Sequence, residues 1–281
     1  EFREDLLDMT EIYQRNNPDV LFDSAMLSAL IGSCSFIYIT QDGTGFPRLQ
    51  VIDGANATGV IDEITGMLKE GYAVLQRDDS GNPILEAYFT AEDTTWYEAG
   101  KPYRTDSHIA GYPLLVPIIH RPDAKRPFGH SRISRACMSY AESAVRTVKR
   151  AEISAEFYSF PQKYVTGLAQ NYEIDDAWKA AMSAFITVTK DDEGEAPKMG
   201  QFQQQSMTPH MDQLRMFASL FAGETSLTLD DLGFPSDNPS SSEAIKAAHE
   251  SLRLKAKKAQ RTFGSGFMNA GFLAACIRDD Y

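Results

Sequence analysis

The sequence predicts an α+β fold in which an antiparallel sheet near the N-terminus is followed by long helices. Between residues 33 and 120, runs of β-branched and aromatic residues alternate with clusters of Gly, Asn, Asp and Pro, as expected for strands joined by tight turns. Outside that range, apolar residues recur every three or four positions, which is the helical period. The chain has 281 residues, 43% of them apolar, so it can bury a substantial core.

The first 32 residues predict two helices that back the sheet. Asn16-Asn17-Pro18 separates them, because proline lacks an amide proton and disfavours helix before itself. The second helix is expected from Asp19 to Gly32. The apolar stripe of the first consists of Phe2, Leu6, Met9, Ile12 and Tyr13.

Six segments predict the antiparallel sheet. Asp78-Asp-Ser-Gly-Asn-Pro83 is a hairpin signal. Asp42-Gly-Thr-Gly45 joins two strands and not a strand and a helix, so we interpret it as a hairpin turn and not as a nucleotide-binding loop. Residues 58–68 predict a short helix between strands. The predicted strands are 35–40, 48–52, 70–77, 84–90, 94–97 and 113–119.

Residues 131–159 predict one long helix, which Phe160-Pro161 ends. Many residues beside its apolar stripe are small, so a second helix can approach closely, and its length exceeds the average. We expect it to pack between subunits or across domains, although a core helix of any helical domain would show the same stripe. The stripe consists of Ile133, Cys137, Tyr140, Ala144, Val148, Ala151, Ala155 and Tyr158.

An insert over residues 160–205 precedes a second helix. It predicts strands at 162–166 and 186–189 around a helix at 175–185, and then an acidic turn. The second helix is expected from His210 to about Thr225. The acidic turn contains Asp191, Asp192, Glu193 and Glu195. The apolar face of the second helix consists of Met211, Leu214, Phe217, Ala218 and Phe221.

Residues 227–242 predict a loop rich in Pro, Ser and Asn that ends at another helix. Either Ser242 caps this helix, or Ser240 does so with Glu243 in a capping box. The helix runs to about Arg261 and can extend to Ile277. From 243 to 261, six basic residues oppose two acidic ones, which leaves a net charge of −16 on the rest of the chain. This basic helix is either a nucleic-acid surface or a solvated face whose charges pair with acidic neighbours.

The sequence argues against catalytic and metal-binding chemistry. Cys34, Cys137 and Cys276 lie far apart without CxxC spacing, which indicates buried thiols in a reducing compartment. The five histidines are scattered singly, and no Walker A, nucleophile-elbow or HExxH motif occurs. We therefore predict a protein that is not an enzyme and needs no cofactor or metal.

The charge and the ends of the chain limit its possible partners. A net charge of −12 argues against tight non-specific DNA binding, which needs cations to neutralise phosphates. No run of eighteen apolar residues occurs, so no transmembrane helix and no membrane partner are expected. The chain begins without Met and without a signal peptide, so we expect a fragment.

The order of these segments resembles the portal, or head-to-tail connector, proteins of tailed double-stranded DNA phages. The strongest match is Leu232 to Lys246, where Asn-Pro-Ser-Ser precedes Glu-Ala-Ile and a basic helix. A second match is Pro113 to Pro122, followed by Gly129 and a long helix, and a third is Ala25 to Ile39. The likeness covers residues 1–277 and depends mainly on the shared order of the parts.

The resemblance implies a structural subunit of a homo-oligomeric ring, expected to be a dodecamer. Double-stranded DNA would pass through the ring, without sequence specificity, during packaging and ejection. The implied partners are the terminase large subunit, capsid or scaffold protein, and head-completion (adaptor) proteins. The implied location is the portal vertex of a phage or prophage virion, and the host cytoplasm during assembly. The implied parts are a wing (1–130), a first stem helix (131–159), a clip (160–205), a second stem helix (206–226), a tunnel loop (227–242) and a wing helix leading to a missing crown (243–281).

Three groups of residues are candidates for these roles. The acidic turn at 191–195 would lie near the docking motor, or it is a solvated turn. Short polar side chains of the tunnel loop would touch DNA without holding it, or the loop is an ordinary surface loop. The third group consists of basic residues, which would either line the channel or meet acidic residues of a neighbouring subunit. The loop residues are Asp230, Asp231, Ser236, Asp237, Asn238, Ser240, Ser241 and Ser242. The third group is Lys246, Arg253, Lys257 and Lys258.

Two other interpretations remain open. A minor capsid protein would form no closed ring. An enzyme of unfamiliar type would show a concave pocket with converging polar groups and shifted pKa values.

Overall fold

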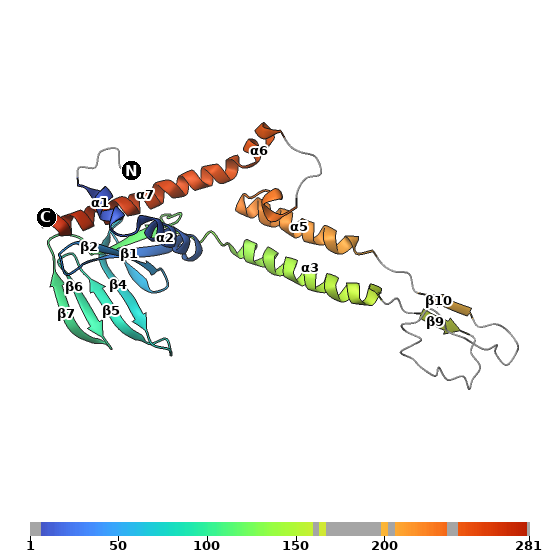
Figure 1. The fold of residues 1–281 in the computed structure, drawn as a ribbon, viewed down its shortest axis with the longest axis horizontal. Coiled ribbons are helices and arrows are strands. Elements are labelled where there is room, and N and C mark those ends of the chain that lie inside the picture. Colours follow the sequence, from blue (N-terminus) through green and yellow to red (C-terminus); the bar gives the residue numbers. More distant parts are fainter. Residues whose placement is uncertain (1–6, 160–162, 167–197, 202–205, 235–240, 280–281) are drawn as a thin grey trace. The chain divides into compact units, whose positions relative to one another are not determined.

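The computed structural model describes residues 7–159, 163–166, 198–201, 206–234 and 241–279 (Figure 1). It contains both helices and antiparallel sheets, in agreement with the predicted α+β class. The chain divides into two compact units. The first comprises Glu1–Ser134 and Lys246–Tyr281, and the second comprises Arg135–Ile245.

The first unit contains two antiparallel sheets where the sequence predicted one. The smaller has the strand order β2-β1-β8, and the larger is a meander with the order β3-β4-β5-β6-β7. The two sheets approach closely at Gly71 on β4 and Leu115 on β8, since a Cβ added at Gly71 would lie 2.7 Å from Leu115 Cδ2. The strands are β1 (Cys34–Gln41), β2 (Pro47–Asp53), β3 (Ala57–Ile61), β4 (Leu68–Arg77), β5 (Pro83–Phe89), β6 (Asp93–Glu98), β7 (Lys101–Ser107) and β8 (Leu115–Ile119).

Helices cover the other face of the three-stranded sheet. The Ser35 hydroxyl on β1 donates a hydrogen bond of 2.7 Å to the Ala25 carbonyl of α2. Ile118 on β8 lies opposite Ser35, and a Cβ added at Gly266 of α7 would lie 2.7 Å from Ile118 Cδ1. Both helices therefore pack on one face, and the core between the layers includes Phe36 and Ile37, both fully buried. The helices are α1 (Met9–Gln14), α2 (Pro18–Gly32) and α7 (Glu250–Asp279).

Residues 58–68, predicted as a helix, form strand β3 and a turn, and β4 begins at Leu68. Gly59 explains the strand: a Cβ there would lie 2.6 Å from the Glu70 carbonyl oxygen, so only glycine allows this close pairing. Asp62 then accepts hydrogen bonds from Ile64 and Thr65 and turns the chain. The sequence prediction also missed β7, an edge strand whose side chains are almost all exposed and which therefore lacks alternating hydrophobicity.

The second unit contains a pair of helices and a small two-stranded sheet. The helices α3 and α5 pack against each other and run in opposite directions (Figure 1). Helix α3 lies within the predicted range, α5 begins at Thr208, two residues before the predicted start, and a 3₁₀ turn follows α5. The elements are α3 (Arg135–Ser159), β9 (Lys163–Thr166), β10 (Lys198–Gln201), α5 (Thr208–Thr225) and η1 (Asp230–Leu232). Strands β9 and β10 are antiparallel.

The basic helix predicted from residue 243 is two helices. A short helix, α6 (Ser242–Ala248), ends before His249, and α7 begins at Glu250. Of the two predicted caps, Ser242 is the first residue of α6, and Ser240 lies outside the described residues. The Ser241 hydroxyl accepts the hydrogen bond from the Ala244 amide, at 3.2 Å.

Candidate functional site

The stripe predicted on the long helix is only partly buried. Cys137 is buried, and Tyr140, Ala144 and Ala151 are half-buried. Ile133 precedes the helix and is 51% exposed, Val148 is 42% exposed, and Ala155 is also exposed. The buried row of α3 therefore departs from the predicted one.

Thr147 takes the buried position that the prediction gave to Val148. Its side chain is 2% exposed, and its hydroxyl donates to the Ser143 carbonyl at 2.9 Å. That hydrogen bond satisfies the polar group, so the threonine can be buried at little cost. A pattern that counts only apolar residues misses this position.

Both helices of the pair expose apolar side chains on their outer sides. On α5, the predicted face is half-buried at Leu214, Phe217, Ala218 and Phe221, whereas Met211 is 58% exposed. Exposed apolar residues over 40% accessible also occur on the outer sides, namely Met138, Val145, Val148 and Ile153 on α3 and Met216 and Leu220 on α5. Exposed apolar surface of this kind is typical of protein interaction sites.

The described part of the 227–242 loop is an ordered acidic turn. Asp231 Oδ2 accepts hydrogen bonds from the Thr228 amide (2.8 Å) and hydroxyl (2.9 Å), and the Asp231 amide donates back to that hydroxyl at 3.2 Å. Gly233 closes the turn with φ of 81°. Asp230 and Asp231 are exposed, Ser241 precedes α6, and Ser242 is the first residue of α6. Ser236, Asp237, Asn238 and Ser240 lie outside the described residues.

The other predicted groups have different outcomes. The acidic turn with Asp191, Asp192, Glu193 and Glu195 lies outside the described residues. Of the basic group, Lys246 lies on α6, and Arg253, Lys257 and Lys258 lie on α7; all four are exposed. Arg253 forms an ion pair with Glu250, at 2.6 Å.

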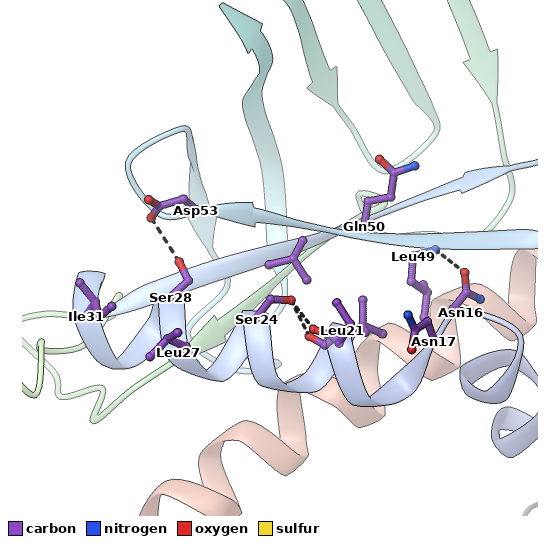
Figure 2. A pocket seen from close by; sticks show the side chains of 12 residues that line it. Asn16, Asn17, Leu21, Ser24, Leu27, Ser28, Ile31, Leu49, Gln50 and Asp53 are labelled. Atoms are coloured by element: carbon purple, nitrogen blue, oxygen red, sulfur yellow. Dashed lines mark hydrogen bonds between the residues drawn. The ribbon is translucent and has the colours of Figure 1, made fainter.

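A surface groove of about 620 Å³ lies between α2 and β2 (Figure 2). The groove is mostly apolar, with Leu27 and Ile31 along α2 and Leu49 on β2. At its end the Ser28 hydroxyl donates to Asp53 Oδ1 at 3.2 Å. The sequence prediction did not find this groove, because it took α2 to be a helix that only backs the sheet.

A second hollow of about 510 Å³ lies beside β6 and β7. Thr94 Oγ1 and both ring nitrogens of His108, which line it, are buried without a hydrogen-bond partner among the described residues. Burial lowers the pKa of His108, and the Asp93 carboxylate opposes this. The neutral imidazole is therefore favoured, and Asp106 is the one carboxylate among the described residues that line the hollow.

The described residues form no other site with evident chemistry. No cluster of three His, Cys, Asp or Glu side chains there could hold a metal ion. The three cysteines are buried, as predicted. None of the helices in the described ranges is both long enough and apolar enough to cross a membrane.

The family model "Phage portal protein, SPP1 Gp6-like" matches residues 3–277. The chain belongs to this portal protein family. It is 26% identical to the "Portal protein" of Mycobacterium phage D29 over 284 residues, which is 93% of this chain and 57% of that protein. It is 25% identical to the "Portal protein" of Mycobacterium phage L5 over 280 residues, 92% of this chain and 56% of that protein. The chain thus spans a little over half the length of these relatives, and the resemblance found in the sequence is confirmed.

Proposed function

We propose that this chain is the core of a portal subunit and that its copies form a ring around a channel for double-stranded DNA. The observation that carries the proposal is the family match over residues 3–277, which includes both units. The proposed parts are the predicted ones: wing, two stem helices, clip, tunnel loop and wing helix. The proposed location is the portal vertex of the virion.

The pair of helices α3 and α5 supports the proposal because its outer sides carry exposed apolar residues. Each helix buries one side against the other and leaves apolar residues such as Val145 (55% exposed) and Met216 (49% exposed) on the outside. Two helices alone cannot cover both their apolar sides, whereas neighbouring pairs in a ring would cover them. We infer that α3 and α5 build the channel wall and pack against the pairs of adjacent subunits.

The loop 227–242 would form the narrowest part of the channel. A conduit must not hold DNA, and every cation placed against a phosphate strengthens binding. The described part of the loop presents Asp230 and Asp231 and no basic residue. The hydrogen bonds between Asp231 and Thr228 give the loop a fixed base. A ring of such loops would repel the phosphates and let the duplex slide.

The proposed partners follow the same assignment of parts. Residues 160–205, with their acidic turn, would face the terminase large subunit and the head-completion proteins. The wing would contact capsid or scaffold protein. The chain would have no catalytic role, and the ATP-driven work of packaging would belong to the motor.

The test is negative-stain electron microscopy of the purified chain together with mass photometry. We expect closed rings with a central hole wide enough for duplex DNA. Val145→Glu on the outer side of α3 should abolish the rings without changing the thermal melt, because a charge there blocks packing between subunits but is solvated in the single chain. Ile64→Glu, at a 93% exposed turn position, is the matched control and should leave the rings intact. Assemblies without closure would contradict the proposal and favour a minor capsid protein.

A further inference from the structure

Helix α2 is apolar on two sides. Leu21, Ala25 and Ala29 are buried against the three-stranded sheet. On the outside, Val20, Leu27 and Ile31 are 61%, 60% and 54% exposed and follow each other at helical spacing. An exposed apolar stripe on the side of a helix away from the core has the character of an interface.

The outer stripe borders the 620 Å³ groove, and Asp53 lies at one end of that groove (Figure 2). The exposed Asp19 and Asp23 lie on the same helix as the stripe, outside the lining of the groove, and with Asp53 they are called the acidic rim below. None of the described residues that line the groove is basic. Ser24 and Ser28 are small, and the Ser24 hydroxyl is turned back to the Val20 carbonyl at 2.5 Å, so the floor is open to an approaching helix.

The first three turns of α7 present the opposite character. The side chains from Arg253 to Lys258 are all exposed, as is Arg261. Leu254, Lys258 and Arg261 follow at steps of four and three and form one row, in which Leu254 is 55% exposed. Helical turns that pack against little gain most of their stability from a partner and not from propensity. Within the described residues, the ion pairs of this segment are limited to Arg253 with Glu250.

We propose that these two surfaces bind each other between copies of the chain, with the groove beside α2 of one subunit receiving the first three turns of α7 of the next. The inference rests on the proposed ring. Leu254 would enter the apolar groove, and Lys258 and Arg261 would meet the acidic rim. Complementary charge fixes the register and selects the partner.

The type of contact fits a ring. An interface between two different surfaces of the same chain is heterologous, and heterologous interfaces generate closed rings when the rotation closes. The basic and acidic surfaces both belong to the first unit, so every copy offers one of each. Duplex DNA is the competing partner for the basic row, and the experiment below separates the two.

The experiment is disulfide cross-linking between copies. Chains carrying only Leu27→Cys are mixed with chains carrying only Leu254→Cys, assembled, oxidised with copper phenanthroline and run on a non-reducing gel. Both positions are more than half exposed, so folding should be unaffected, and the three native cysteines are buried, so the background should be low. We expect a cross-linked dimer from this mixture. The matched control pairs Leu254→Cys with Ile64→Cys, which lies on the turn after β3, outside both surfaces, and should cross-link far less.

Charge reversal provides an independent readout. Reversing Asp19 and Asp23 to Lys, or Lys258 and Arg261 to Glu, should raise the concentration needed for assembly about tenfold or more. Combining all four changes in one chain should restore assembly, since the rim and the row then attract again. If the combined variant does not restore the assembly that the separate reversals weaken, the inference is overturned.

The outcomes distinguish this inference from the proposed function. If the unmodified chain forms rings but the Leu27 and Leu254 positions cross-link no better than the control, the inference is wrong and the ring stands. If the unmodified chain forms no closed assembly, the proposed function fails and this inference fails with it. If reversal of Lys258 and Arg261 weakens duplex DNA binding and leaves assembly unchanged, these residues serve DNA and the inference is wrong.

Discussion

The packing of α7 on the three-stranded sheet can be tested with three glycines of one helix. A Cβ added at Gly266 would lie 2.7 Å from Ile118 Cδ1 and 3.1 Å from the Pro117 carbonyl oxygen. At Gly271 it would lie 2.9 Å from Met9 Sδ. At Gly264 it would meet nothing within 4 Å. The three positions therefore share a helix and differ in the space around the missing methyl group.

The expected magnitudes follow from two opposing effects. Replacing glycine by alanine within a helix stabilises it by about 0.8–1 kcal/mol, and this gain is similar at all three sites. Overpacking a core costs about 1–3 kcal/mol. Ile118 is fully buried and Pro117 contributes a backbone atom, so neither can move easily at Gly266. At Gly271 the nearest atom is the sulfur of the flexible Met9 side chain, which can give way more readily, although Tyr13 Cε2 also lies 3.1 Å away.

We therefore expect Gly264→Ala to raise the free energy of unfolding by about 1 kcal/mol. The free energy of unfolding of Gly266→Ala should be lower than that of Gly264→Ala by about 1–3 kcal/mol, and that of Gly271→Ala should lie between the two. Urea denaturation followed by circular dichroism measures these free energies. The stabilisation from replacing glycine by alanine in a helix is similar in all three variants, so it cancels when they are compared. Equal midpoints for Gly264→Ala and Gly266→Ala would refute the packing of α7 against β8.

Two further predictions concern the dependence of stability on pH. Hydrogen bonds, first from Thr44 and then from Phe46 and Arg48, lower the pKa of Asp42 from its ordinary 3.8 to about 2, so the stability that they provide is present above pH 4 and is lost as the pH falls toward 2. In urea midpoints measured at several pH values, Asp42→Asn should weaken this loss of stability at low pH, and an unchanged loss would contradict the assignment. Burial lowers the pKa of His108 below its ordinary 6.5, so the unfolded chain takes up a proton first and stability falls as the pH drops below about 6.5. His108→Gln should remove part of that fall between pH 7.5 and 5.5. If the stability of the variant instead depends on pH in the same way as that of the unmodified chain, this would count against a buried neutral imidazole.

Local sequence patterns predicted the elements that bury one face in a regular way. The break at Asn17-Pro18 is confirmed, with Asn17 at a φ of 50° and Pro18 in the first position of α2. The hairpin turn at Asp42 is also confirmed, and its carboxylate accepts hydrogen bonds from within the loop. In these places the residue type and the local geometry determine each other, so no distant contact was needed.

The errors occurred where distant contacts decide the structure. Whether strands form one sheet or two depends on pairings such as Ile37 with Val116, which lie far apart in the chain. β3 was mistaken for a helix because its pairing depends on the space that Gly59 leaves for β4. The cap of α6 was misplaced by one residue, at Ser241, since adjacent serines are equally good candidates. The groove beside α2 depends on the tertiary placement of β2, which no local pattern contains.

The distribution of charge links the two proposals. The chain is acidic overall, with a net charge of −12, but residues 243–261 are basic. If the row containing Lys258 and Arg261 faced the channel, each phosphate contact in each subunit would add to the salt-dependent grip on DNA. If the same row is covered by the acidic rim of the next α2, the basic charge instead serves the subunit contact and leaves the channel. The interface proposed for α7 would therefore also explain how a ring with a basic helix in every subunit can remain a conduit that does not hold DNA.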